Sequence, residues 1–213
     1  MDTDQLPDHI VYSKNVIEFV TVAAETCLFL EHATEFPRTD FVQKSIKLLP
    51  LLYLKASLVD MPTAVFDDEV EHFVAEEDYL FVRQQVEQQL GADDSYLEVF
   101  HPDMALSDTP IAAFVSENLA DVYQELKDFA ANFQLGDVDI MNDALVACLE
   151  AFAEHWGQKS LNALRALHAL RYSDGFGTEE LEDTKKENKK IDRNSFLNFL
   201  HDNEEDELND LLN

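Results

Sequence analysis

The chain has 213 residues, of which 46% are hydrophobic and 10% aromatic, so it can bury the core of one domain. Its 44 acidic and 15 basic residues give a formal net charge of −29, which argues against binding to nucleic acid or to anionic membrane surfaces. An all-β chain of this length would need more turn residues than 5 glycines and 6 prolines, so long helices are expected.

Apolar residues recur at helical spacing in the first half of the chain. Three helices are expected there, over residues 13–33, about 40–59 and 76–90. Pro50 is expected to kink the second helix, and Gly91 ends the third. The pattern of residues 61–74 is ambiguous between regular elements and a loop, and residues 92–107 are expected to form a loop or a short helix.

Two longer elements follow, over residues 109–134 and 138–172, and they are expected to pack against each other. Pro110 opens the first, because a proline in the first turn has its φ preset and loses no needed hydrogen bond. Gly136 separates the two elements, and Gly157 is expected to interrupt the second. The predicted fold class is all-α, an irregular bundle of about six or seven helices with an acidic C-terminal tail.

The composition changes after residue 172, where a polar and highly charged stretch begins. We therefore expect a helical domain over residues 1–172 and an acidic linker and tail over residues 173–213. The tail regains apolar residues at Phe196, Leu197 and Leu200, which predicts a short amphipathic helix. That helix docks in the groove of another protein, or it folds back on its own domain, or this end of the chain is frayed.

Cys27 and Cys148 each lie in an apolar helical stretch and lack CxxC spacing, so both are expected to be buried and unpaired. Two reduced cysteines are typical of a reducing compartment. The N-terminal residues show no secretory signal, and no apolar run approaches the roughly 20 residues that span a bilayer. A cytoplasmic location without membrane contact is therefore expected.

Charge is unevenly distributed at residues 157–172, which include three basic residues and no acidic one, directly after a helix with an acidic face. One interpretation is a structural ion-pair network, in which Arg165 lies within salt-bridging distance of Glu117 or Asp121. The other is an anion pocket at Arg165 and His168 for a carboxylate or a phosphate. The candidate binding residues are Glu117, Asp121, Lys159, Asn162, Arg165 and His168.

Glu69 and His72 have the Glu-x-x-His spacing of helical di-iron sites, in which both ligands face inward from one helix. Such a site needs a second copy on another helix, which the adjacent pairs Glu31–His32 and Glu154–His155 do not supply, so no metal site is expected. The sequence also lacks GxSxG, the P-loop, GxGxxG and HExxH. No catalytic residue and no cofactor are therefore expected.

Three stretches carry a resemblance to a known family, namely residues 48–55 (LLPLLYLK), 115–128 (VSENLADVYQELKD) and 156–168 (WGQKSLNALRALH). They resemble a family of uncharacterised bacterial proteins of similar length, well represented among Bacteroidetes-type bacteria and described only as a domain of unknown function. The resemblance covers roughly residues 10–172. It implies an all-helical fold and no particular activity.

The expected function is that of a non-enzymatic cytoplasmic protein in interaction or regulation, whose protein partner is basic or binds the tail. The alternative is an enzyme or small-molecule binder that uses the anion pocket at Arg165 and His168. An acidic mimic of nucleic acid is the third reading of the charge. An uncovered apolar groove in the structure would favour the first function, and a polar pocket would favour the second.

Overall fold

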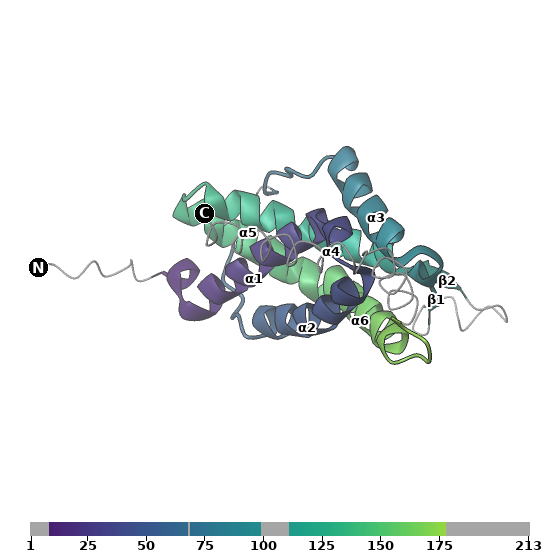
Figure 1. The fold of residues 1–213 in the computed structure, drawn as a ribbon. Coiled ribbons are helices and arrows are strands. Elements are labelled where there is room, and N and C mark those ends of the chain that lie inside the picture. The colour runs from purple at the N-terminus through teal and green to yellow at the C-terminus, as the bar shows by residue number, and fades with distance from the viewer. Residues whose placement is uncertain (1–8, 68, 99–110, 178–213) are drawn as a thin grey trace, which may run out of the picture. The chain divides into compact units, whose positions relative to one another are not determined.

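A computed structural model describes residues 9–67, 69–98 and 111–177, and within these residues the fold is mainly helical (Figure 1). The α-helices are α1 (Lys14–Glu31), α2 (Arg38–Ser57), α3 (Glu76–Leu90), α4 (Val115–Gln134), α5 (Val138–Ala151) and α6 (Gly157–Arg171). Shorter helical segments are the 3-10 helices Ile10–Tyr12, Ala33–Glu35 and Gly91–Asp94 and the π-helical turn Phe152–Trp156. Strands β1 (Ser95–Leu97) and β2 (Ala112–Phe114) pair antiparallel, with Tyr96 opposite Ala113. The predicted all-α bundle of six or seven helices is confirmed.

Helix α4 lies at the centre of the bundle and contacts α1, α3, α5 and α6. Its apolar residues recur at steps of three and four, which places Leu119, Leu126 and Phe129 on its buried side. Phe129 stacks on Phe19 of α1 with ring centroids 5.2 Å apart, and Phe19 stacks on Trp156 at 6.4 Å. Burying a large apolar side chain contributes roughly 1.5–3 kcal/mol, so these rings anchor α1 and the π-helical turn to α4.

Helix α4 begins at Val115, later than the predicted start at residue 109. The residues just before it form β2, so their backbone groups bond to β1 and cannot extend the helix. Asp94, buried before β1, caps α4 by accepting hydrogen bonds from the backbone N–H of Ser116 at 2.7 Å and from its hydroxyl at 2.6 Å. Pro110, on which the predicted start depended, lies outside the described residues.

Helices α5 and α6 form one continuous element through the π-helical turn. Gly157 does not interrupt this element, contrary to the prediction, and lies buried in the first turn of α6. A Cβ atom there would lie 2.9 Å from ring carbons of Phe152 and would clash with its carbonyl oxygen, so close packing requires glycine. Trp156 is fully buried beside it, and its indole N–H donates to the carbonyl oxygen of Cys148 at 2.9 Å.

The segment of residues 60–75, which we call the strap, links α2 to α3 and has no helix or strand among its described residues. Asn142 and Asp143 of α5 hold its first half and form the first clamp. Asp143 accepts hydrogen bonds from the backbone N–H groups of Val65 and Phe66, each at 2.7 Å. Asn142 donates to a strap carbonyl oxygen at 2.8 Å.

Asp128 and Asn132, one turn apart on α4, form the second clamp and hold the other half of the strap. Asp128 accepts hydrogen bonds from the backbone N–H groups of Phe73 at 2.7 Å and Val74 at 2.9 Å, and from the ring of His72 at 2.9 Å. Asn132 donates to a strap carbonyl oxygen at 2.8 Å. Because the Asp128 carboxylate is buried, these N–H donors replace the water that would otherwise solvate its charge.

The chain divides into two compact units, residues 1–173 and 174–213. The helices and strands given above all belong to the first unit. The predicted docking residues of the tail, Phe196, Leu197 and Leu200, lie outside the described residues. In the described part of the chain, no helix is both long and apolar enough to cross a membrane.

Candidate functional site

The predicted binding residues lie in different surroundings. Lys159 on α6 forms an ion pair with Asp121 on α4, with Nζ and Oδ2 3.1 Å apart. Asp121 also accepts a hydrogen bond from the hydroxyl of Tyr79 at 2.9 Å, and its carboxylate lies 3.8 Å from the ring of His155. Glu117 lies in the first turn of α4. An ion pair therefore does join α4 to the α6 segment, and its basic residue is Lys159.

The predicted pairing of Arg165 with Glu117 or Asp121 is wrong, because Arg165 forms no ion pair with any described residue. The reason is the register of the two helices. They run antiparallel about the turn at Gly136, which brings Asp121 level with Lys159. Arg165 lies six residues farther along α6, and it is exposed at a hollow of about 160 Å³ that Tyr96 and Leu97 of β1 also line.

The hollow beside Arg165 is poorly suited to an anion, because the carboxylate of Glu98 lines it. Asn162 and the hydroxyl of Tyr96 each donate a hydrogen bond to Glu98 Oε2 at 3.2 Å. His168 does not line this hollow, and its ring packs against the tyrosine that follows α6, with centroids 4.7 Å apart. The structure therefore does not bring Arg165 and His168 together around one cavity.

Glu69 and His72, which match the spacing of a di-iron helix, lie in the strap and not on a helix. Helical spacing therefore does not place their side chains on one face. His72 instead contacts Asp128 in the second clamp. Among the residues that the structure describes, no group of three or more His, Cys, Asp or Glu side chains is arranged to hold a metal ion.

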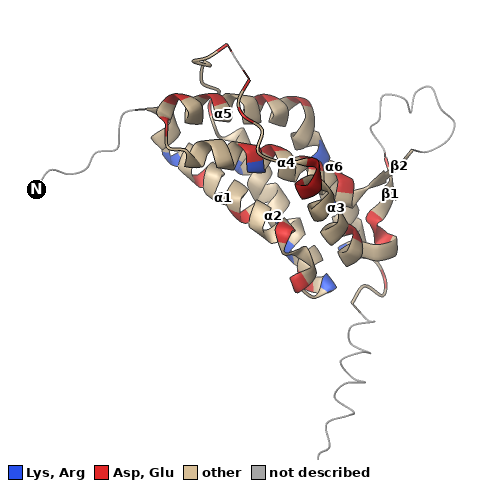
Figure 2. Ribbon diagram, turned by 90° about the horizontal axis from the view of Figure 1, so that it is seen from above, with Lys and Arg blue, Asp and Glu red and all other residues tan. Residues whose placement is uncertain are grey.

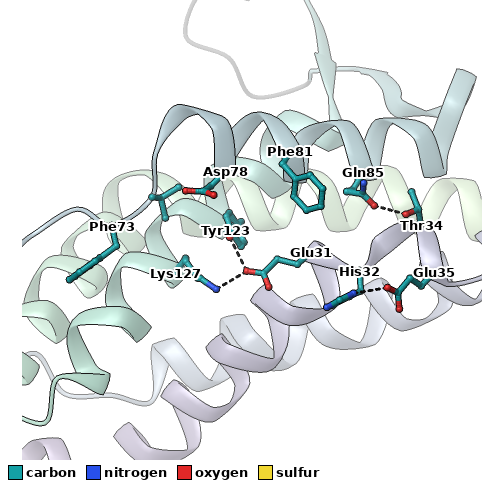
Figure 3. Close-up of a pocket in the computed structure, with 11 residues that line it drawn as sticks. Glu31, His32, Thr34, Glu35, Phe73, Asp78, Phe81, Gln85, Tyr123 and Lys127 are labelled. Atoms are coloured by element: carbon teal, nitrogen blue, oxygen red, sulfur yellow. Dashed lines mark hydrogen bonds and ion pairs between the residues drawn. The ribbon is translucent and has the colours of Figure 1, made fainter.

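A hollow of about 630 Å³, which we call the cleft, opens between α1, α3, α4 and the strap (Figure 3). Its volume is typical of ligand pockets, which span about 300–1,000 Å³. None of its lining was predicted from the sequence, because the lining comes from segments that are far apart in the chain. The lining residues are Glu31 of α1, His32 just after it, Thr34 and Glu35 of the 3-10 helix that follows, Phe73 and Val74 of the strap, Asp78, Phe81 and Gln85 of α3, and Tyr123 and Lys127 of α4.

Glu31 connects α1 to α4 in the cleft. Its Oε1 accepts hydrogen bonds from the hydroxyl of Tyr123 at 2.9 Å and from the ammonium group of Lys127 at 2.7 Å (Figure 3). The hydrogen bond with Glu31 raises the pKa of Lys127. Burial, together with the same carboxylate, raises the pKa of Tyr123. At neutral pH Lys127 is therefore charged and Tyr123 neutral.

Two phenyl rings border the cleft. Phe81 points from α3 toward the end of α1, and Phe73 projects from the part of the strap that Asp128 holds (Figure 3). Their exposed fractions, 49% for Phe81 and 42% for Phe73, leave about half of each side chain open to solvent. Phe81 stands outside the buried stripe of α3, which contains Val82 and Val86. In the sequence, this site could have been recognised from Phe81, an aromatic residue that lies outside the apolar stripe of a charged helix.

Carboxylates outnumber cations around the cleft. Glu31, Glu35 and Asp78 line it, and Lys127 is its one lysine or arginine among the described residues. Glu35 lies 2.8 Å from the ring of His32, and Asp78 accepts a backbone hydrogen bond at the start of α3 at 3.0 Å. Aromatic rings beside an excess of negative charge attract a cationic group.

Cys27 and Cys148 are both buried and unpaired, which confirms the prediction. Burial raises the pKa of the Cys27 thiol to about 12 and that of the Cys148 thiol well above its ordinary value. Both thiols are therefore neutral at physiological pH, and the thiolate is the form that reacts as a nucleophile.

A family model described as a domain of unknown function (DUF5063) matches residues 10–173. The crystal structure of protein BF1032 from Bacteroides fragilis is 45% identical to this chain, with a TM-score of 0.70. The match covers 78% of this chain and 97% of that chain. No curated protein matches the sequence.

Proposed function

Since the chain belongs to the DUF5063 family, a domain of unknown function, we propose its function from the cleft: it is a non-enzymatic module that binds a basic segment of a partner protein. The family match confirms the resemblance that the sequence blocks predicted. We place this binding in the cytoplasm, a location supported by the two unpaired cysteines.

The observation that carries the proposal is the combination of half-exposed phenyl rings and carboxylates in one cleft. Phe73 and Phe81 offer aromatic surface, and a cation over such a ring gains about 0.5–2 kcal/mol. Glu31, Glu35 and Asp78 supply negative charge to the same cavity. An arginine or lysine side chain has an apolar stem and a cationic head, so it complements both features.

The charge of the whole chain supports a basic partner. The net charge is −29, and Figure 2 shows acidic residues along several helices with few basic residues between them. A surface of this sign raises the local concentration of cationic groups and speeds their association. The proposed partner is therefore a protein segment rich in lysine or arginine.

The protonation states of Lys127 and Tyr123 argue against either side chain as a general acid or base. General acid–base catalysis needs a group whose pKa lies near the working pH. The pKa values of Lys127 and Tyr123 are both raised, away from neutrality. The alternative, an anion pocket at Arg165, has less support because the carboxylate of Glu98 lines its hollow.

The proposal is tested by titrating the ¹⁵N-labelled full-length protein with the tripeptide Arg-Arg-Arg at physiological salt. We expect the largest chemical-shift changes at Phe73, Phe81 and Tyr123. The Phe81→Ala variant should bind the tripeptide about threefold to tenfold more weakly. The matched control is Phe114→Ala, which removes a 40% exposed phenyl ring from β2 and should retain the wild-type affinity. Chemical-shift changes that spread evenly over the acidic surface would overturn the proposal. An equal loss of affinity for the tripeptide in both variants would also overturn it.

A further inference from the structure

A second hollow adjoins the cleft and shares Lys127 with it. This hollow, which we call the alanine groove, has a volume of about 390 Å³ and lies between α1 and α4. Ala24 and Leu28 of α1 line one side, and Ala130 and Ala131 of α4 line the other. Leu28 is 49% exposed, so the groove presents apolar surface to solvent.

The cleft and the alanine groove follow one another along the seam where α1 packs on α4. On α1, Glu31 lines the cleft, and Ala24, about two turns earlier, lines the groove. On α4, Tyr123 lines the cleft, and Ala131, about two turns later, lines the groove. Each helical turn rises about 5.4 Å, so these two pairs of lining residues are about 11 Å apart along their helices.

We propose that the α1–α4 seam is a two-part docking track for one amphipathic helix of a partner protein, with a cationic side chain in the cleft and an apolar side chain in the alanine groove. This inference rests on the proposed function and adds that the partner segment is an amphipathic helix. Side chains about seven residues apart lie on the same face of a helix and are separated by about 10.5 Å. That separation matches the spacing of Glu31 from Ala24 and of Tyr123 from Ala131 along the seam.

The alanines make the groove suitable for a helix. The small side chains of Ala24, Ala130 and Ala131 leave room between α1 and α4 for a partner side chain to enter. An apolar anchor there would cover Leu28 and remove its surface from water. Buried anchors in pockets of this kind provide most of the binding energy of an interface.

The charges of the cleft favour a cationic side chain as the partner residue that enters it. Tyr123 and Lys127 both donate to Oε1 of Glu31, so Oε2 carries no hydrogen bond from the described part of the chain. With Asp78 and Glu35, this oxygen can receive an incoming guanidinium or ammonium group. A wholly apolar helix would desolvate these carboxylates without compensation, and an acidic or phosphorylated helix would be repelled.

The test uses the full-length protein and two fluorescein-labelled helical peptides of identical composition on an alanine and lysine background. In the first peptide, arginine and leucine are about seven residues apart, and in the second the leucine is moved to the opposite face. We expect the first peptide to bind about tenfold more tightly in fluorescence anisotropy, because only its leucine enters the groove. This comparison uses the wild-type protein and does not depend on the folding of any variant.

Two variants locate the effect. Ala131→Gln fills the alanine groove and should remove the preference for the first peptide, whereas Ala169→Gln, at an exposed position on α6, should retain it. Both variants should bind Arg-Arg-Arg like the wild type, because the cleft is unchanged. Equal affinities of the two peptides, or a preference that persists in Ala131→Gln, would overturn the docking track and leave the proposed function standing. Failure of Arg-Arg-Arg to bind at the cleft would overturn both.

Discussion

At the scale of single residues, buried aspartates join distant parts of this chain. Asp94, Asp128 and Asp143 are buried, and within the described residues none of them pairs with a lysine or an arginine. Each instead accepts backbone N–H hydrogen bonds, which are strong when the acceptor is charged. At Asp143, burial acts to raise the pKa, but the N–H groups of Val65 and Phe66 and a neighbouring amide outweigh it and lower the pKa.

Replacing Asp143 by alanine should destabilise the domain. The change removes the charged acceptor of the N–H groups of Val65 and Phe66, and a hydrogen bond to a charged group contributes about 1.5–3 kcal/mol. We expect the free energy of unfolding in urea to fall by roughly 2–4 kcal/mol. Glu150→Ala removes an exposed carboxylate from the same helix and should change it by less than about 0.5 kcal/mol. Similar losses in the two variants would show that the first clamp contributes little.

His72 should make the second clamp sensitive to pH. Its hydrogen bond to Asp128 raises its pKa above the ordinary value of 6.5, and burial opposes this only in part. The protonated ring therefore stabilises the fold, and its contribution is complete below about pH 6.5 and lost as the pH rises through the raised pKa. The stability difference between wild type and His72→Ala should shrink between about pH 6 and about pH 9 in urea unfolding. A difference that stays constant over this range would contradict the expectation.

At the scale of elements, the spacing of apolar residues predicts where the helices lie. The path of the strap and the pairing of helices depend on polar contacts between residues far apart in sequence. The predicted helix over residues 76–90 coincides with α3, and Gly91 ends it with a φ of 58°. The strap could not be predicted, because its backbone bonds to Asp128 and Asp143, which lie 55 and 78 residues away in sequence. The charge pattern correctly predicted an ion pair at Asp121, but it assigned Arg165 as the partner where the structure has Lys159. The register between two packed helices depends on their three-dimensional packing and cannot be derived from the sequence of either helix.

Gly157→Ala should lower the melting temperature, although alanine is the better helix former. The added Cβ would meet the carbonyl oxygen and ring of Phe152 and disturb the packing of Trp156. Overpacking costs about 1–3 kcal/mol, which exceeds the roughly 1 kcal/mol that alanine gains over glycine in a helix. Gln158→Ala, at the exposed next position, is the control and should leave the melting temperature nearly unchanged. A higher melting temperature for Gly157→Ala would show that the π-helical turn accommodates the methyl group.

At the scale of the whole molecule, net charge opposes the compact state. With 44 acidic and 15 basic residues, most carboxylates have no cation to pair with. Ion pairs such as Lys55 with Glu18, whose atoms are 2.6 Å apart, offset only part of the repulsion. Folding therefore brings many carboxylates closer together. Repulsion between like charges exceeds attraction between opposite charges, so screening by salt favours the folded state.

Salt should for this reason stabilise the protein. Raising NaCl from about 0.01 M to about 0.15 M shortens the Debye length from about 30 Å to about 8 Å, which screens repulsion between distant carboxylates. We expect the melting temperature in scanning calorimetry to rise over this range. Potassium chloride at the same ionic strength is the control for specific sodium binding and should give the same rise. A falling melting temperature would mean that ion pairs, and not repulsion, dominate the electrostatics.

The two clamps hold the two halves of the strap separately, so the chain can be divided within the strap into two fragments. A break between Glu69 and Val70 would part α1 and α2 from α3 to α6, yet each new end would remain hydrogen-bonded to its own carboxylate, Asp143 or Asp128. The contacts of α1 with α4 and of α2 with α6 would also persist across the break. Fragments ending and beginning at this bond, produced separately, should therefore recombine into one fold, and the protein would then serve as a split reporter whose halves complement each other.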